Sequence, residues 1–238
     1  MGFAEGEFIE IECSMWRASD NTLVSTTSRE IAEKNSIYEK NARYSPQLVI
    51  VGKDNTLKGI VNAINGMGIG ETKKAEMKPE EAFGAREADL VKVMRLADFR
   101  KRDIEPEPGM RITLDGTSAT VKSVDSGRVV IDANHPLAGE RLTAEIKVVR
   151  QIDGEKGRAA ALAESYGLKP DKIEIEGKAL RLEFGSGTEK EEGYFMNKKA
   201  LVAALLRYIG AERVVVEEEY SGAAAAEKQE GEKPQIPA

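Results

Sequence analysis

One apolar-striped helix set among short strands is the feature that most constrains the fold. Leu57, Ile60, Val61 and Ile64 recur at i, i+3, i+4 and i+7, and Gly66 can end such a helix in a left-handed cap. The segments around it are short, and they alternate apolar with polar residues or form compact apolar runs: 8–13, 47–51 and 71–77. An apolar stripe must pack against an apolar surface, so this helix is predicted to face a core.

Size and charge narrow the class of protein. A chain of 238 residues can bury a core and usually forms one large domain or two smaller ones, and we expect two modules. Its content of 41% hydrophobic and 32% charged residues is typical of a globular protein, and no run approaches the roughly 20 apolar residues of a membrane span. A net charge of −6 argues against a nucleic-acid partner. We therefore expect neither nucleic acid nor membrane among its partners.

Cysteine and histidine are each present once. A single cysteine cannot form an internal disulfide, and one cysteine with one histidine cannot supply a Cys/His metal site. The N-terminal residues 1–12 lack the basic start and apolar core of a signal peptide. These features predict a cytoplasmic protein without a Cys/His metal site.

A glycine cluster at Gly66, Gly68 and Gly70 invites comparison with phosphate-binding loops. Such loops follow a strand and open a helix, whereas these glycines follow the predicted helix and precede the predicted strand 71–77. The order of elements therefore argues against nucleotide binding.

The sequence pattern changes between residues 88 and 132. Turn signals at 115–116 and 125–127 separate three short predicted strands, which indicates a small meander of hairpins. A unit of this size buries little apolar surface by itself. Met94, Phe99 and Met110 are therefore candidates for exposed side chains that bind a partner.

The last part of the chain reads as a separate α/β module. Residues 154–220 show helix, strand, strand, helix and strand in order, which suits helices on one face of an antiparallel sheet. The stripe Leu201, Leu205, Leu206 and Ile209 either packs in the core of this module or pairs it with a second copy or a client. Residues 221–238 have too few apolar groups to order, and we expect a disordered tail.

Three quoted stretches resemble a known family. They are LVIVG at 48–52 with LKGI at 57–60 and NGMGIGE at 65–71, then PEEAFGAR at 79–86, and finally NHPLAGERLTAEIKVV at 134–149. Together and in this order, over residues 6–152, they resemble the long-chain FKBP-type peptidyl-prolyl isomerases related to the SlyD chaperones. The resemblance implies an α+β fold with an FKBP-like half-wrapped antiparallel β-sheet around one helix, an inserted small β-rich flap domain and a C-terminal α/β module.

The implied domain boundaries follow from that fold. Residues 1–87 and 133–153 would form the isomerase core, 88–132 the flap with chaperone activity, 154–220 the C-terminal domain and 221–238 the tail. The implied activity is the cis-trans isomerisation of Xaa-Pro bonds in unfolded or partly folded chains, which accelerates protein folding and needs no metal or cofactor. A homodimer through the C-terminal domain is a further candidate assembly.

The resemblance also implies a set of site residues. The catalytic pocket would comprise Ser25, Leu57, Ile60, Phe83, His135 and Leu137. Substrate contacts would come from Cys13, Val24, Val51, Thr56, Asn134 and Ala144, and from Met94, Phe99 and Met110 in the flap. For His135 two readings stay open, because it can either touch the substrate at the rim or hold its own corner by a hydrogen bond.

Five positions depart from the family pattern. Cys13 and Phe83 each replace a tyrosine, Val24-Ser25 replaces a Phe-Asp pair, and Ala144 replaces a phenylalanine. Fewer aromatic walls and a missing carboxylate predict reduced turnover. The alternative function is a holdase chaperone that binds unfolded chains with a weakened or inactive pocket.

Overall fold

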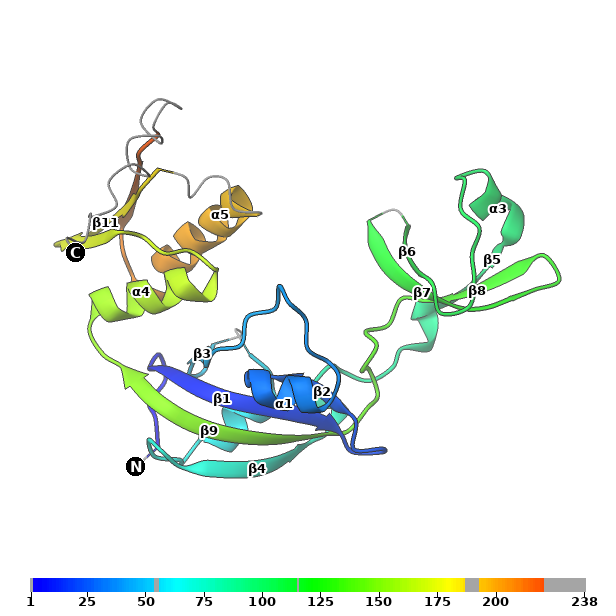
Figure 1. Cartoon of the computed structure of the whole chain (residues 1–238), viewed down its shortest axis with the longest axis horizontal. Coiled ribbons are helices and arrows are strands. Elements are labelled where there is room, and N and C mark those ends of the chain that lie inside the picture. The colour runs from blue at the N-terminus through cyan, green and yellow to red at the C-terminus, as the bar shows by residue number, and fades with distance from the viewer. Residues whose placement is uncertain (1, 54–55, 115, 187–192, 221–238) are drawn as a thin grey trace, which may run out of the picture.

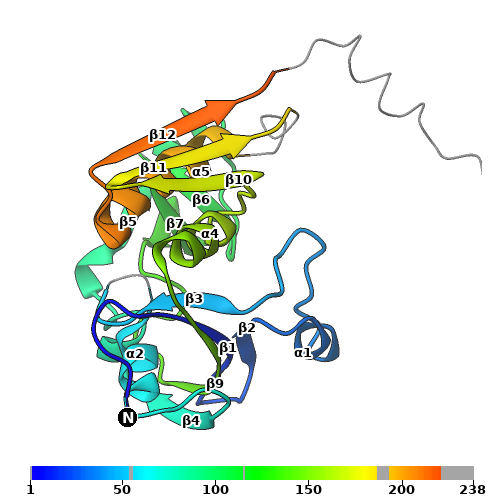
Figure 2. The same cartoon turned by 90° about the vertical axis from the view of Figure 1, so that its left-hand side faces the viewer.

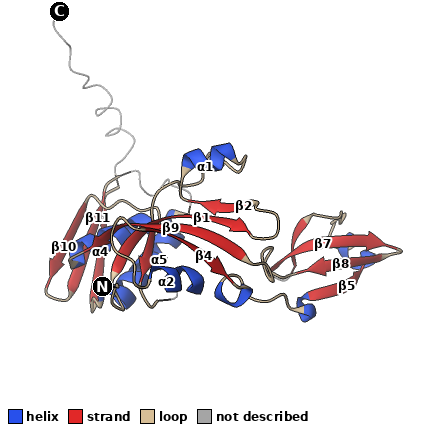
Figure 3. Ribbon diagram, turned by 90° about the horizontal axis from the view of Figure 1, so that it is seen from below, coloured by secondary structure: helices blue, strands red, loops and turns tan. Residues whose placement is uncertain are grey.

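The computed structural model describes residues 2–53, 56–114, 116–186 and 193–220. The predicted tail 221–238 lies outside them. Three sheets follow one another in space, with the flap sheet and the C-terminal module at opposite ends of a central sheet (Figures 1 and 3). The mixed α+β class is confirmed. None of the described helices is long and apolar enough to cross a membrane.

The central sheet has five antiparallel strands. Its order is β2-β1-β9-β4, with β3 pairing the first half of β1, and the strands are β1 (Phe8–Arg17), β2 (Leu23–Thr26), β3 (Gln47–Ile50), β4 (Thr72–Met77) and β9 (Leu142–Ile152). Helix α2 (Lys58–Ile64) covers one face, whereas α1 (Arg29–Lys34) lies in the connection after β2 (Figure 1). The predicted strands 47–51 and 71–77 form to within one residue at their ends, and the predicted strand 8–13 is the first part of the longer β1.

Alternation along β1 and β9 explains why α2 packs where it does. Ile9 and Ile11 of β1 and Leu142 of β9 are fully buried in the cluster that contains Ile60 of α2. Gly59 permits the close approach, because a Cβ atom there would lie 2.4 Å from Cγ of Met77 in β4. The helix stripe thus meets the apolar surface that the sequence requires.

The flap is a four-stranded antiparallel sheet with a core of its own. Its order is β5-β8-β7-β6, and its elements are η2 (Ala88–Leu90), β5 (Val91–Arg95), α3 (Leu96–Arg100), β6 (Arg111–Leu114), β7 (Thr117–Asp125) and β8 (Arg128–Asp132). The fourth strand, β5, comes from the apolar run at 90–96. Phe99 is only 1% exposed within this core. The ring thus packs on the flap's own sheet, and its contact with substrate stays a prediction.

The C-terminal module has a mixed sheet rather than the expected antiparallel one. It comprises α4 (Glu155–Ser165), β10 (Lys172–Glu176), β11 (Ala179–Phe184), α5 (Tyr194–Ala204), the π-helical turn η4 (Leu205–Ile209) and β12 (Arg213–Glu218). Strands β10 and β11 are antiparallel, whereas β11 and β12 are parallel. The reason is that α5 and η4 carry the chain back before β12 starts, as a parallel connection requires (Figure 2).

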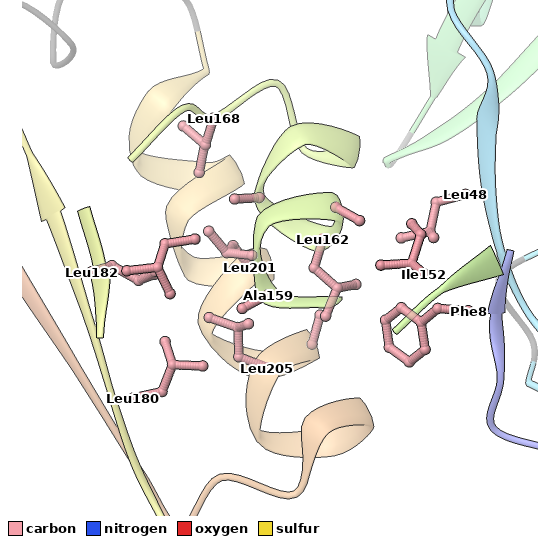
Figure 4. Close-up of a cluster of buried hydrophobic side chains, with 14 of the residues drawn as sticks. Phe8, Leu48, Ile152, Ala159, Leu162, Leu168, Leu180, Leu182, Leu201 and Leu205 are labelled. Carbon is pink, nitrogen blue, oxygen red and sulfur yellow. The ribbon is translucent and has the colours of Figure 1, made fainter. Parts of the chain in front are cut away.

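A single apolar cluster joins this module to the central sheet. Phe8, Leu48 and Ile152 project from the sheet toward Leu162 of α4, and Leu201 of α5 lies behind (Figure 4). The cluster residues drawn there are at most 8% exposed. The central sheet is thus apolar on both faces at this end, with α2 on one face and α4 on the other.

Candidate active site

Two aromatic rings meet where the chain leaves the central domain and where it returns. Phe83 follows the short turn η1 (Pro79–Glu81), and its ring stacks on the imidazole of His135 with centroids 4.1 Å apart and planes 5° from parallel. The backbone N–H of Leu137 donates to Nδ1 of His135 over 3.2 Å. In the neutral ring the proton therefore lies on Nε2, which leaves that atom as a donor.

Both readings of His135 find support in this geometry. The hydrogen bond from Leu137 holds the corner, and His135 is exposed to solvent, so its contact with substrate stays a prediction. Leu137 itself is 8% exposed, so it is part of the interior beneath the corner.

The apolar residues predicted for the pocket lie together around α2. The cluster beside α2 contains seven of the predicted site residues: Cys13, Val24, Val51, Leu57, Ile60, Phe83 and Ala144. Leu57 is the residue that begins α2 and is half-buried, whereas Ile60 is 1% exposed on the inner face. Thr56 stands just before them and accepts a hydrogen bond from the Gln47 amide over 3.2 Å. The structure therefore joins residues that are up to 131 positions apart in sequence.

Cys13 contributes a neutral apolar thiol to this cluster. Burial raises the pKa of the Cys13 thiol to about 12, since the thiolate would lose its hydration inside the protein. A protonated thiol is a poor nucleophile. The cysteine therefore acts as a wall residue and not as a reactive group.

Ala144 and Ser25 differ in their surroundings. Ala144 is fully buried on β9 between Met15 of β1 and Ala75 of β4. Ser25 lies opposite Met15 on β2, is exposed, and borders a hollow of about 750 Å³ between the central sheet and α4. A role for Ser25 beside the reacting bond therefore stays a prediction.

Asn134 differs most from its predicted role in substrate binding. Its Oδ1 accepts from the backbone N–H of Glu87 over 2.8 Å, and its Nδ2 donates to the carbonyl oxygen of Glu87 and to Oδ1 of Asp132. The polar groups of this side chain are thus used inside the protein. Sequence reasoning missed Asp132, although an Asp two residues before Asn134 is a signal for a turn in which the carboxylate caps a backbone N–H.

Asp132 is a buried carboxylate with several donors. Burial acts to raise its pKa, but hydrogen bonds from the side chain and backbone of Asn134, with the charges of Arg86 and Lys122, outweigh it and hold the pKa of Asp132 below its usual value. Arg86 forms an ion pair with the carboxylate. The charged form is therefore the stable one at neutral pH.

Comparison with known proteins assigns the family. The family model described as FKBP-type peptidyl-prolyl cis-trans isomerase matches residues 6–99, and a model described as the FKBP26 IF domain matches residues 92–137. A short-type peptidyl-prolyl cis-trans isomerase of Methanocaldococcus jannaschii is 32% identical over 144 residues, which are 60% of this chain and 90% of that protein. The chain belongs to the FKBP-type peptidyl-prolyl cis-trans isomerases.

Other relatives place the isomerase near the SlyD group. An FKBP-type isomerase named SlyD from Helicobacter pylori is 31% identical over 136 residues, which are 53% of this chain and 72% of that protein. A probable FKBP-type 16 kDa isomerase of Pseudomonas fluorescens is 28% identical over 138 residues, covering 56% and 91% respectively. The enzyme class and the likeness to SlyD expected from the sequence are both confirmed.

Proposed function

We propose that this isomerase accelerates the folding of other proteins by holding unfolded segments on its flap while its core pocket isomerises their Xaa-Pro bonds. The observation that carries the proposal is the exposure of apolar side chains on the flap. Val93 of β5 is 63% exposed and Met110, before β6, is 41% exposed. Strands β5 and β6 are also the two edges of the flap sheet, where an extended client can add as a further strand.

The proposed chemistry needs no covalent step. An Xaa-Pro bond resists rotation because amide resonance creates a barrier of about 18 to 20 kcal/mol. The twisted transition state has lost that resonance and is less polar, so the apolar surface of Leu57 and Phe83, with Ile60 buried in the same cluster, would favour it over the planar ground state. About 4 kcal/mol of differential binding corresponds to a thousandfold acceleration.

His135 would add a directional contact to this apolar surface. Its Nε2–H is the free donor once Nδ1 is occupied by the N–H of Leu137. We assign to it a hydrogen bond to a carbonyl oxygen of the substrate beside the proline. The stack on Phe83 keeps the plane of the imidazole fixed, so the donor does not have to be oriented when substrate binds.

A comparison of two substrates tests the role of the flap. We expect the double variant Val93→Ser/Met110→Ser to slow the proline-limited refolding of an unfolded protein at least several-fold more than the isomerisation of a proline tetrapeptide. The reason is that a tethered client meets the pocket at a raised effective concentration, which a short peptide does not experience. The matched control is Leu206→Ser, which changes an apolar side chain of similar exposure, 42%, in the C-terminal module.

The same assay separates the isomerase from the holdase alternative. An isomerase shortens the slow refolding phase at a low ratio of enzyme to client. A holdase leaves this phase unchanged or prolongs it, and needs stoichiometric amounts. Equal losses for both substrates in the flap variant would contradict the proposed tethering.

The remaining partners and the location also stand as proposals. We propose unfolded chains in the reducing cytoplasm as clients, in keeping with a single buried free cysteine.

A homodimer through the C-terminal module is a further proposal. Leu201 and Leu205 are fully buried within the module, so pairing would need exposed side chains such as Phe195 and Met196 of α5. Light scattering of the full chain and of Phe195→Ser tests the homodimer, since a mass of one chain for both proteins would refute it.

A further inference from the structure

The two segments that connect the flap to the central domain are joined to each other at successive points. The β5–β8 ladder ends at the pair Val91 and Asp132, and the N–H of Ala133 then donates to the carbonyl oxygen of Leu90 over 3.0 Å. Nearer the central domain, the N–H of Gly139 donates to the carbonyl oxygen of Gly84 over 2.8 Å. Phe83 and His135 stack at that end, so backbone bonds cross the connection both beside the flap sheet and near the ring pair.

The Asn134 side chain fills the one place where the backbone ladder is interrupted. Residues 88–90 form a short 3-10 turn, in which the N–H of Leu90 donates to the carbonyl oxygen of Glu87 over 3.3 Å. Glu87 itself is extended, and across the connection its N–H and carbonyl oxygen are bonded by the Asn134 side chain. The carboxamide of Asn134 offers an acceptor and a donor side by side, as a backbone peptide does. It bonds both groups of Glu87, at 2.8 and 2.9 Å, and so continues the ladder.

Asp132 fixes the carboxamide in this orientation. Oδ1 of Asp132 accepts from Nδ2 of Asn134 over 2.8 Å and from its backbone N–H over 3.0 Å, and Arg86 binds the other carboxylate oxygen. Asp132 is 6% exposed, so its interactions are poorly screened by solvent. Because His135 follows Asn134 directly, the same bonds also fix the position of the backbone that carries the imidazole.

We propose that Asn134 is a positioning residue that holds the flap in a fixed orientation relative to the Phe83–His135 pair. Its effect on catalysis rests on the proposed function, because the distance between flap and pocket matters only for a client that the flap holds. Its effect on the orientation of the flap does not depend on the proposed function. The effective concentration of a client at the core pocket depends on whether the flap and the pocket are held at a distance the client can bridge. A loose connection would therefore lower the benefit of binding the client to the flap.

Nitrogen-15 relaxation of the full chain tests the geometric claim. In the parent protein we expect the amides of β7 and β8 to report the same rotational correlation time as those of β1 and β9. In Asn134→Ala the flap value should fall at least 1.5-fold below the central-sheet value. The matched control is Asn35→Ala, which also removes a carboxamide bonded to a backbone carbonyl but lies after α1. Equal flap and core values in Asn134→Ala would overturn the proposal, and a lower melting temperature without decoupling would mark a merely structural role.

Kinetics of the same variants separate this proposal from the one on which it rests. With decoupling, we expect KM for an unfolded protein client to rise about fivefold more than KM for a tetrapeptide, with little further loss in kcat. Decoupling without that difference would leave Asn134 as the positioning residue and refute client tethering. Should Asn134→Ala fail to fold, Arg86→Ala provides the test, since the Arg86 side chain is 49% exposed and its loss frees one oxygen of Asp132. Flap relaxation identical to the parent in that variant would count against the proposal.

Discussion

The ring of Phe83 lies parallel to the imidazole of His135, with centroids 4.1 Å apart. The two residues flank the inserted flap, since the first precedes residue 88 and the second follows residue 132. Their stack therefore closes the central domain at the point where the insertion leaves and returns. It also unites the apolar cluster around α2 with the one imidazole of the chain.

Replacing the ring of Phe83 tests the stack. We expect Phe83→Leu to lower kcat/KM for a proline tetrapeptide by about two- to tenfold, because an aromatic pair contributes about 0.5 to 1.5 kcal/mol beyond burial. Tyr38→Leu is the control, since it removes a ring stacked on Tyr44 at 5.5 Å in a loop outside the cluster. Equal activity in both variants would show that the stack does not orient His135 for catalysis.

A phenylalanine at position 144 tests the space in the pocket. Ala144 is fully buried, so Ala144→Phe should overpack the sheet and lower the free energy of unfolding by about 1 to 3 kcal/mol, without a gain in turnover. Urea denaturation and the tetrapeptide assay measure the two effects, with the smaller change Ala144→Val alongside. A variant that stayed stable and turned over faster would reveal a hollow large enough for the ring.

The buried thiol of Cys13 predicts a loss of stability at alkaline pH. Burial raises its pKa from 9.0 to about 12, so the folded state keeps the proton where the unfolded state loses it. The thiol's contribution is fully present below pH 9 and disappears as the pH rises toward 12, by about 1.4 kcal/mol per pH unit. Cys13→Ala removes this dependence. Parallel pH profiles of unfolding free energy in the two proteins would contradict the assignment.

The shared core predicts that α4 stabilises the central sheet. Leu162 is 3% exposed among Phe8, Leu48 and Ile152, and Leu162→Ala should cost about 2 to 5 kcal/mol. Trp16, the single tryptophan, lies on β1 and reports unfolding of the central sheet by fluorescence. Leu206→Ala, at an exposed site of the same module, is the control. An unchanged Trp16 transition in Leu162→Ala would mean that the C-terminal module does not stabilise the sheet.

Local pattern determined a large part of this structure. The stripe of Leu57, Ile60 and Ile64 forms α2, and alternation over 8–13 forms the first half of β1, because helix and strand periods depend on the chain's own geometry. The quoted motifs indicated the family and hence the gathering of Phe83 and His135. These inferences need only the order and spacing of residues.

Tertiary contact decided the rest. Apolar Phe8 and Leu48 give no sign in the sequence that α4 covers them, and Phe99 shows as apolar without showing which surface it covers. Asn134 reads as a polar pocket residue, but its carboxamide is taken up by the backbone of Glu87, which lies 47 positions earlier. The physical reason is that periodicity fixes which face of an element is apolar, whereas the partner of that face, or of a polar group, is set by segments that meet only on folding.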